Sequence, residues 1–269
     1  MSETFDRLVA VMSRLRGEDG CPWDREQDHH TLKAYVLEEA YEVLEAIESG
    51  RAASLKEELG DLLFQVIFHA QIAKENGVFD IEAVLTAIVD KMIHRHPHVF
   101  SKNSRATKNG EGQQIDSADV LARWEDLKKS EPGNHHRKSA LDGVPLALPA
   151  LLRAQKIQSR AARVGFDWPY AAPVRLKIDE ELGELEEAVD GGEQARIESE
   201  LGDLLFSIVN YARFLKVNSE DALRGAMTRF TERFQDMESQ AEAEGVTLDS
   251  LSLDEMNRLW EKAKVRARF

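Results

Sequence analysis

The sequence repeats itself, and this repeat constrains the fold more than any other feature. The heptapeptide ELGDLLF occurs at residues 58–64 and again at 200–206, which is 142 positions later. A glutamate-rich segment, EEAYE at 38–42, has its counterpart in EELGE at 180–184 at the same spacing. Two separate motifs at one offset indicate that the chain consists of two copies of one structural module.

Each module is predicted to be helical. The chain has only 16 glycines, 7 prolines and 7% aromatic residues in 269 positions, which is typical of all-α proteins rather than of sandwiches or barrels. Because segment 55–74 is apolar nearly all round, we expect it to be a central, buried helix. Apolar residues recur with helical spacing over 5–15, 32–48, 55–74, 81–94 and 117–129, and in the second half over 150–164, 174–190, 196–216, 219–243 and 253–266.

The boundary between the modules is predicted near residue 140. The first module, residues 1–140, includes a segment at about 101–117 that is rich in Ser, Asn, Gly and Lys and is expected to be a mobile loop. A linker at about 129–149 contains prolines and glycines that interrupt periodic structure. The second module then spans residues 141–269.

Composition excludes several classes of function. The net charge is −14, and Lys and Arg are scattered among acids, so we expect no nucleic acid partner and no anionic membrane partner. The single cysteine, Cys21, permits neither an intrachain disulfide nor a cysteine-based zinc site. The N-terminus has no signal-peptide pattern, and no apolar run approaches the roughly 18 residues of a membrane span. We therefore expect a soluble, cytoplasmic protein.

Acidic residues recur at spacings that bring them together on helix surfaces. Glu39 and Glu42 lie three residues apart on one predicted helix, and Glu58 and Asp61 begin the next. Two carboxylates about 4 Å apart repel by roughly 4 kcal/mol at an effective dielectric constant near 20, so several share a pocket only with protons or cations. Carboxylate oxygens alone suit a hard cation, Mg²⁺ first and Mn²⁺ as a possible substitute.

The alternative to a metal site is a solvated acidic surface. On a helical wheel, Glu39 and Glu42 lie largely opposite Leu37, Tyr41 and Leu44, which allows that alternative. Two features oppose it. The aspartate of each ELGDLLF copy sits where an almost wholly apolar helix begins, a costly place for an unpaired charge, and the whole arrangement recurs in both halves. The pattern therefore favours a divalent metal site.

At these residues the sequence resembles the MazG family of nucleoside triphosphate pyrophosphohydrolases. The family signature is Glu-Glu-x-x-Glu followed, after a spacer, by Glu-x-x-Asp, and it appears here in both halves. The resemblance continues through CPWD at 21–24, RHPHVF at 95–100, LDGVP at 141–145 and VGFDW at 164–168. It therefore covers nearly the whole chain.

The resemblance implies an all-α fold whose helical bundles are completed in a homodimer. It also implies Mg²⁺ dependence and conversion of an NTP or dNTP to the monophosphate and pyrophosphate. The metal ligands that it implies are Glu39, Glu42, Glu58 and Asp61 in the first module, and Glu181, Glu184, Glu200 and Asp203 in the second. The nucleotide contacts that it implies are Lys177, Ile178, Asp179, Glu180, Glu181, Arg196, Ile197, Glu198, Ser199, Glu200, Arg229, Phe230, Thr231, Glu232, Arg233 and Trp260.

The residue types fit this chemistry. Mg²⁺ held by the acids can bridge triphosphate oxygens and orient a water for attack at the α-phosphorus, which expels pyrophosphate. A carboxylate outside the direct metal shell could take the proton of that water. Glu180 in the second module, or Glu38 in the first, is our candidate for this general base.

Basic and aromatic residues supply further candidates. Arg229 and Arg233 lie one helical turn apart, so both guanidinium groups could meet a polyphosphate. Their counterparts in the first half are Lys91 and Arg95, and the alternative for both pairs is a solvated basic stripe. Trp260 could stack on a base, although a tryptophan more often packs in a core.

The second module is expected to be the main active site. Lys177 precedes its acids where the first module has Tyr35, and Lys91 stands in the place of Arg229. The first module would then be weakly active, regulatory or structural. Two other functions stay open on the sequence alone. One is a helical module that binds Mg²⁺, a nucleotide or a protein without turnover, and the other is a purely structural helical dimer.

Overall fold

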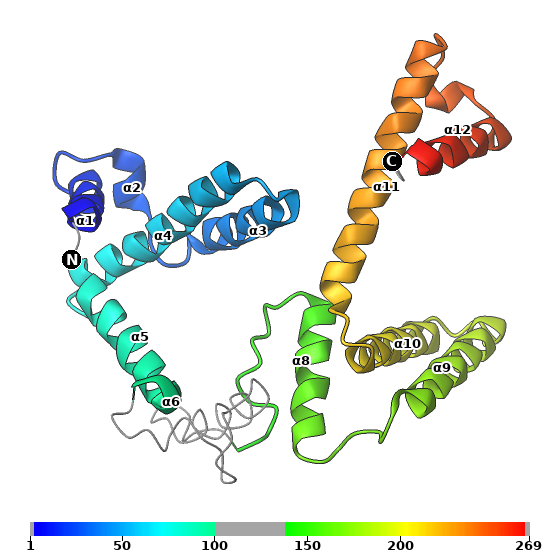
Figure 1. Cartoon of the computed structure of the whole chain (residues 1–269), viewed down its shortest axis with the longest axis horizontal. Coiled ribbons are helices and arrows are strands. Elements are labelled where there is room, and N and C mark those ends of the chain that lie inside the picture. The colour runs from blue at the N-terminus through cyan, green and yellow to red at the C-terminus, as the bar shows by residue number, and fades with distance from the viewer. Residues whose placement is uncertain (1–2, 101–137, 267–269) are drawn as a thin grey trace. The chain divides into compact units, whose positions relative to one another are not determined.

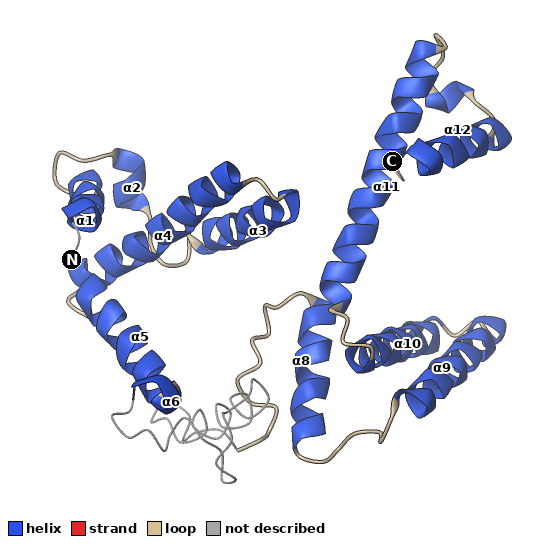
Figure 2. Ribbon diagram, in the orientation of Figure 1, coloured by secondary structure: helices blue, strands red, loops and turns tan. Residues whose placement is uncertain are grey.

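The computed structural model describes residues 3–100 and 138–266, and throughout these ranges the regular structure is helical (Figure 2). No helix in these ranges combines the length and the apolar character of a membrane span. The predicted all-α fold is therefore confirmed for the described part of the chain. The loop predicted at 101–117, the helix predicted at 117–129 and the linker residues 129–137 lie outside the described residues.

The chain divides into two compact units between residues 135 and 136, whereas the sequence placed the boundary near residue 140. The helices of the first unit are α1 (Glu3–Leu15), α2 (Pro22–Glu26), α3 (Lys33–Ser49), α4 (Ala52–Glu75), α5 (Ile81–Arg95) and α6 (Pro97–Phe100). Those of the second are α8 (Ala150–Arg163), α9 (Ala171–Gly191), α10 (Gln194–Phe214), α11 (Ser219–Ala243), the 3-10 helix η3 (Leu248–Ser250) and α12 (Leu253–Arg266).

Each unit contains a long helical hairpin that turns at a glycine. Gly50 follows α3 and Gly192 follows α9, with φ values of 67° and 69°. Glycine adopts this left-handed conformation without the clash that a Cβ atom would cause, so it ends a helix at low cost. The chain then reverses, and α4 packs along α3 as α10 packs along α9 (Figure 1).

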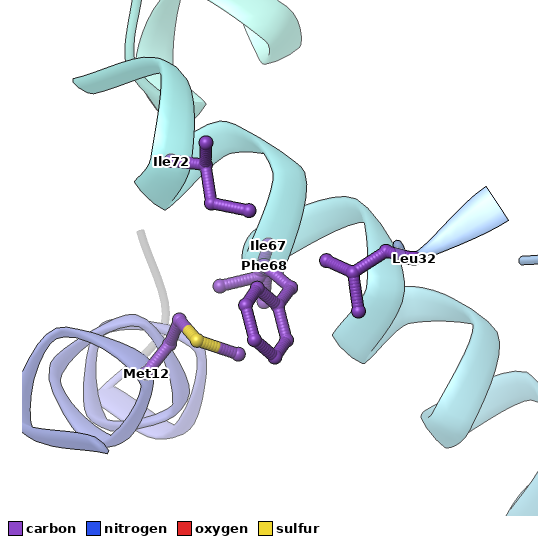
Figure 3. Packing of buried hydrophobic residues seen from close by; sticks show 5 residues of the cluster. All are labelled: Met12, Leu32, Ile67, Phe68 and Ile72. Carbon is purple, nitrogen blue, oxygen red and sulfur yellow. The ribbon is translucent and has the colours of Figure 1, made fainter. Parts of the chain in front are cut away.

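The core of the first unit forms where α1 meets the second half of α4. Met12 of α1, Leu32 just before α3, and Ile67, Phe68 and Ile72 of α4 are buried together (Figure 3). Burial of a side chain of this size contributes about 1.5–3 kcal/mol. This core anchors the C-terminal half of α4 and leaves its N-terminal half, which carries the acidic motif, to pair with α3.

Helix α4 is not buried along its whole length, so the prediction of a central buried helix is wrong for the single chain. Leu59, Leu63 and Val66 are 49%, 40% and 42% exposed. The reason is that α1 reaches only the second half of α4, and α3 covers only one side of the first half. Leu201 and Leu205 of α10 are exposed in the same way.

The second unit has two parts. Helices α8 and α9 pack against α10, and α11 contacts α8 near its start. From there α11 runs away from the α9–α10 hairpin and carries α12 against its far half (Figure 1). The contact between α11 and α12 is built from four buried residues, Met237, Ala241, Leu259 and Ala263.

Candidate metal and nucleotide site

Three carboxylates come together on the α9–α10 hairpin. Glu181 and Glu184 lie on α9, one turn apart, and Glu200 lies near the start of α10. Each offers one oxygen atom, and the three oxygens lie within 4.8 Å of one another. The antiparallel hairpin therefore brings residues that are 16 or more positions apart in sequence to one point, as their spacing on the two helices predicts.

Two cations of the same hairpin accompany this cluster. Lys177 Nζ lies 2.7 Å from Oε1 of Glu180 and 2.7 Å from Oε1 of Glu181. Hydrogen bonds to these two carboxylates raise the pKa of Lys177 well above its usual value, so the side chain is charged. Arg196 Nε lies 3.7 Å from Glu200 Oε1. The cluster is thus partly neutralised by the chain itself.

The carboxylates of this cluster still repel one another. Glu181 is only 5% exposed, so its charge is partly desolvated. Partial desolvation, followed by repulsion from Glu181, raises the pKa of Glu184 above its usual value. Both effects disfavour the ionised form of the acid, and positive charge nearby would favour it. A divalent cation would supply that charge.

Asp203 lies beside this cluster rather than within the group of three. It lines a cavity of about 400 Å³ together with Lys177 and Glu181. The cavity extends from the acids to α8 and to the 164–170 segment, where its lining is mostly apolar. The acidic cluster and the cavity therefore share a border.

The first unit holds a corresponding cluster on its α3–α4 hairpin. Oxygens of Glu39, Glu58 and Asp61 lie within 4.8 Å of one another. Glu42 is outside this group of three, but it lies close enough to contribute. Partial desolvation and then repulsion from Glu42 raise the pKa values of both Glu39 and Glu58. In the position of Lys177 this unit has Tyr35, whose ring packs edge-on against Trp23 with 5.6 Å between the ring centres.

Both clusters fit a divalent cation by the chemistry of their donors. They offer carboxylate oxygens, the ligands of hard cations such as Mg²⁺, Mn²⁺ and Ca²⁺, and no sulfur or imidazole ligand belongs to either group. Desolvation and then repulsion between carboxylates raise the pKa values of three of the acids, and a cation bound among them would oppose both effects. Each cluster could therefore hold a metal ion.

Comparison with known proteins identifies the same domain in both halves of the chain. The profile of the MazG nucleotide pyrophosphohydrolase domain matches residues 27–100 and 173–237, which contain the two acidic hairpins. The chain belongs to the MazG family. The repeated module predicted from the sequence is thereby confirmed as two MazG domains.

Relatives match over almost the full length. The nucleoside triphosphate pyrophosphohydrolase/pyrophosphatase MazG of Thermotoga maritima is 45% identical over 260 residues, covering 97% of this chain and 95% of that protein. The nucleoside triphosphate pyrophosphohydrolase of Escherichia coli K12 is 46% identical over 266 residues, covering 97% of both. A crystal structure of a MazG-related protein from Thermotoga maritima overlays with a TM-score of 0.37 at 29% identity, covering 46% of this chain and 98% of that one.

The residues expected at the nucleotide fall into two groups in this MazG chain. The segments 177–181 and 196–200 flank the acidic cluster on α9 and α10. The segment 229–233 and Trp260 lie on α11 and α12, where the Arg233 guanidinium sits 5.8 Å from the centre of the Trp260 ring. Because α11 runs away from the α9–α10 hairpin (Figure 1), one chain does not bring the two groups together.

The other predicted residues lie at the surface. Glu180, the candidate base, is exposed and is held by Lys177, and Glu38 is exposed on α3. Lys91 is exposed on α5, and Arg95 is half-buried near the end of the same helix. Their roles stay predictions.

Sequence reasoning missed the apolar cavity. Trp168, which belongs to the VGFDW motif, lines it together with Gln158 and Asn210, to which no sequence motif points. One signal was present in the sequence. Asn210 interrupts the apolar face of α10 at the place where the first module has Phe68.

Proposed function

We propose that this chain is a Mg²⁺-dependent enzyme that hydrolyses nucleoside or deoxynucleoside triphosphates to the monophosphate and pyrophosphate. The observation that carries the proposal is the α9–α10 cluster, in which Glu181, Glu184 and Glu200 converge beside Lys177 and a cavity. The names of the relatives that match over nearly the full length agree with this reaction. The C-terminal MazG domain is the main active site in this proposal.

The ligands of the metal in this site are Glu181, Glu184 and Glu200, with Asp203 at the edge of the cavity as the fourth acid. Mg²⁺ bound by these oxygens would offset the charge of the triphosphate and make a coordinated water more acidic. Lys177 and Arg196 pair with two of these acids, and they would be available to phosphate oxygens if a metal neutralised the carboxylates. Attack by water at the α-phosphorus then releases pyrophosphate.

Glu180 is our candidate for the base that accepts the proton of the attacking water. It lies beside Glu181 on α9, outside the group of three converging carboxylates. Its partner Lys177 holds the side chain at the border of the cluster, with 2.7 Å between Nζ and Oε1. A carboxylate positioned next to a metal site but free of it can take a proton in this way.

We further propose that the enzyme acts as a homodimer. The apolar side chains exposed on α4 and α10, among them Leu59, Leu63, Leu201 and Leu205, form faces of a kind that monomers rarely leave uncovered. A second copy would cover them and would also bring α11 of one chain to the acids of the other. Arg233 and Trp260 of the second copy would then complete the nucleotide site.

For the first MazG domain we propose divalent metal binding without comparable turnover. Glu39, Glu58 and Asp61 converge as their counterparts do. However, Tyr35 takes the place of Lys177, so this domain has no cation at that position to meet a phosphate.

The test is incubation of the pure protein with Mg²⁺ and each common NTP and dNTP, with the products separated by ion-exchange chromatography. Monophosphate and pyrophosphate are expected, and both should disappear in excess EDTA. Diphosphate and orthophosphate would contradict the assigned bond. Absence of any product at every substrate would overturn the enzymatic proposal. The Glu184→Gln variant serves as a control against a contaminating phosphatase, because it should lose the activity.

A further inference from the structure

Two histidines of the first domain meet where the connection between α2 and α3 crosses α4. His29 lies in this connection and His69 lies on α4, and their Nδ1 atoms are 2.8 Å apart. The ring centres are 5.1 Å apart, and the ring planes are within 11° of parallel. Because the distance between the centres exceeds that between the nitrogens by about two ring radii, both nitrogens lie on the line that joins the centres. The rings therefore meet edge to edge, with the two Nδ1 atoms pointing at each other.

This geometry is that of a hydrogen bond and not that of two metal ligands. Imidazole nitrogens bound to one ion lie about 2.0–2.1 Å from it, and their lone pairs converge on the ion instead of on each other. In a bond between two Nδ1 atoms, one ring donates its N–H and the other accepts with a bare nitrogen. The pair can take up one extra proton on Nε2 of the donating ring. A second extra proton must go on the accepting Nδ1, and it breaks the bond.

The surroundings of the pair oppose this second proton. His69 is half-buried, and desolvation, followed by the charge of His29, lowers the pKa of His69 below its usual value of 6.5. In the described part of the chain, His29 is the charged group that acts on His69. Charged groups on the elements around α4 are engaged with other residues: Arg16 with Glu75, Glu39 with Gln65, Asp80 with the amide of Ala83, and His30 with Asp28.

The histidine pair holds the middle of the α2–α3 connection, whose two ends are anchored separately. At one end, Arg16 Nη1 donates to the carbonyl oxygen of Gln27 at 3.1 Å. At the other end, Leu32 is fully buried in the core of the first unit (Figure 3). Between these anchors lies a turn, residues 28–31, that carries the first histidine. Loss of the bond between the histidines would therefore release this turn from α4 and leave both anchors in place.

The second domain has no such pair. At the spacing of 142, His29 corresponds to Ala171 and His69 corresponds to Tyr211. Neither of these side chains takes up a proton near neutral pH as a histidine does. The pair is therefore a property of the first domain, whereas the acids of the proposed main active site lie in the second.

We propose that His29 and His69 form a pH-sensitive switch in the first MazG domain, which is closed while the pair holds at most one extra proton and open when both rings are protonated. Opening frees the 28–31 turn from α4. The unfolded chain takes up the second proton more readily than the folded chain does. The closed pair therefore contributes stability above the ordinary histidine pKa of 6.5, and this contribution is lost as the pH falls through the lower folded value. The inference is independent of the proposed reaction.

The first experiment is a double-mutant cycle of His29→Ala and His69→Ala in the full chain, measured by urea unfolding in EDTA at pH 7 and at about pH 5. The contribution of the acids cancels in the cycle. The coupling of the two histidines should favour folding by about fivefold in the equilibrium constant at pH 7, and this favourable coupling should be absent at pH 5. His30→Ala combined with His69→Ala is the matched control, and it should show no coupling at either pH. Absence of coupling at pH 7, or equal coupling at both pH values, would overturn the switch.

A second measurement follows the release of the turn and uses a variant that does not titrate. The side-chain amide of asparagine places a hydrogen-bonding atom near the position of Nδ1 and takes up no proton, so His69→Asn should stay closed at both pH values. Hydrogen exchange of the peptide that covers residues 28–31 is measured by mass spectrometry and corrected for the intrinsic effect of pH. Protection should fall about fivefold from pH 7 to pH 5 in the wild type and stay constant in His69→Asn. Unchanged protection in the wild type, or an equal loss in His69→Asn, would overturn the proposal.

Discussion

Glu181 combines two properties that conflict unless a cation is present. It is 5% exposed, and it lies among carboxylates whose oxygens are within 4.8 Å of its own. Lys177 relieves part of this conflict through the 2.7 Å ion pair. Arg196 pairs with Glu200 as well, yet desolvation and then repulsion from Glu181 still raise the pKa of Glu184. These residues therefore form a group that could hold a divalent cation.

Substitution of Glu181, compared with substitution of its counterpart Glu39, tests which of the two domains carries the activity. Glu181→Gln removes one ligand charge at the α9–α10 cluster, and we expect pyrophosphate release to fall on the order of 100-fold, since a bound metal contributes several kcal/mol to such a reaction. Its counterpart Glu39→Gln should reduce the activity less than threefold if the second domain carries the turnover. Initial rates at saturating Mg²⁺ measure both. A larger loss in Glu39→Gln than in Glu181→Gln would contradict our assignment.

The raised pKa values give a pH dependence with a definite sign. Glu39, Glu58 and Glu184 have folded-state pKa values above the ordinary 4.5, so without metal the folded chain holds their protons more tightly than the unfolded chain does. Their contribution to stability is most favourable below the ordinary pKa, and it is lost as the pH rises through the raised values. Mg²⁺ binds the ionised acids and offsets this loss.

We therefore expect Mg²⁺ to raise the Tm more at pH 7 than at about pH 5, because protons compete for the same oxygens at the lower pH. Thermal scans with Mg²⁺ and with EDTA at both pH values measure this difference. KCl at matched ionic strength serves as the control for screening. An equal rise at both pH values would mean that these acids do not bind the metal.

At the scale of elements, the hairpin is the unit that builds each acidic site. The turn after α9 decides whether Glu200 meets Glu181 and Glu184, and Gly192 forms this turn with φ of 69°. The neighbouring Gly191 is the last residue of α9 and has no positive φ. A Cβ atom added to either glycine meets no atom within 4 Å. The two positions therefore differ in backbone conformation alone.

This pair makes a matched test of the turn. Gly192→Ala should lower the free energy of unfolding by about 1–2 kcal/mol, the cost of a left-handed conformation with a Cβ atom. Gly191→Ala should leave it unchanged or raise it by about 0.5 kcal/mol, because alanine favours the helix. Urea unfolding of the full chain followed by circular dichroism measures both. Equal effects of the two changes would show that the turn does not require glycine.

Sequence patterns are sufficient to predict the bounds of several helices. Predicted helices at 81–94, 150–164 and 219–243 are observed as 81–95, 150–163 and 219–243, because capping residues and local periodicity decide where a helix begins and ends. Asp80, for example, caps α5 by accepting from the amide of Ala83. Burial was harder to predict. The apolar composition of α4 indicated a buried helix, yet which side is covered depends on the lengths of its neighbours α1 and α3.

At the scale of the whole molecule, the predicted nucleotide residues remain in two groups within one chain. Arg233 packs over Trp260 on α11 and α12, and its Nε is buried without a hydrogen-bond partner. The acids lie on the α9–α10 hairpin, away from this pair (Figure 1). A second copy of the chain is our proposed means of joining them.

Complementation between two inactive variants tests this arrangement. Glu181→Gln and Arg233→Gln should each be inactive alone, whereas dimers formed by co-expression should recover about a quarter of the wild-type activity, since half the dimers are mixed and each mixed dimer has one intact site. Pyrophosphate release per chain is the measurement. If Arg233 serves the acids of its own chain, every site stays defective and no recovery occurs.

The sequence alone determined the helical class, the duplication and which acids share a face of one helix, because helix periodicity relates residues only three or four positions apart. It also assigned the MazG family through motifs that are short and contiguous. Only the tertiary structure decided that Gln158 of α8 and Asp203 of α10 line one cavity, and that α4 keeps an exposed apolar side. These features join elements that are distant in the chain, and their contacts depend on helix lengths and turns acting together, which no local pattern encodes.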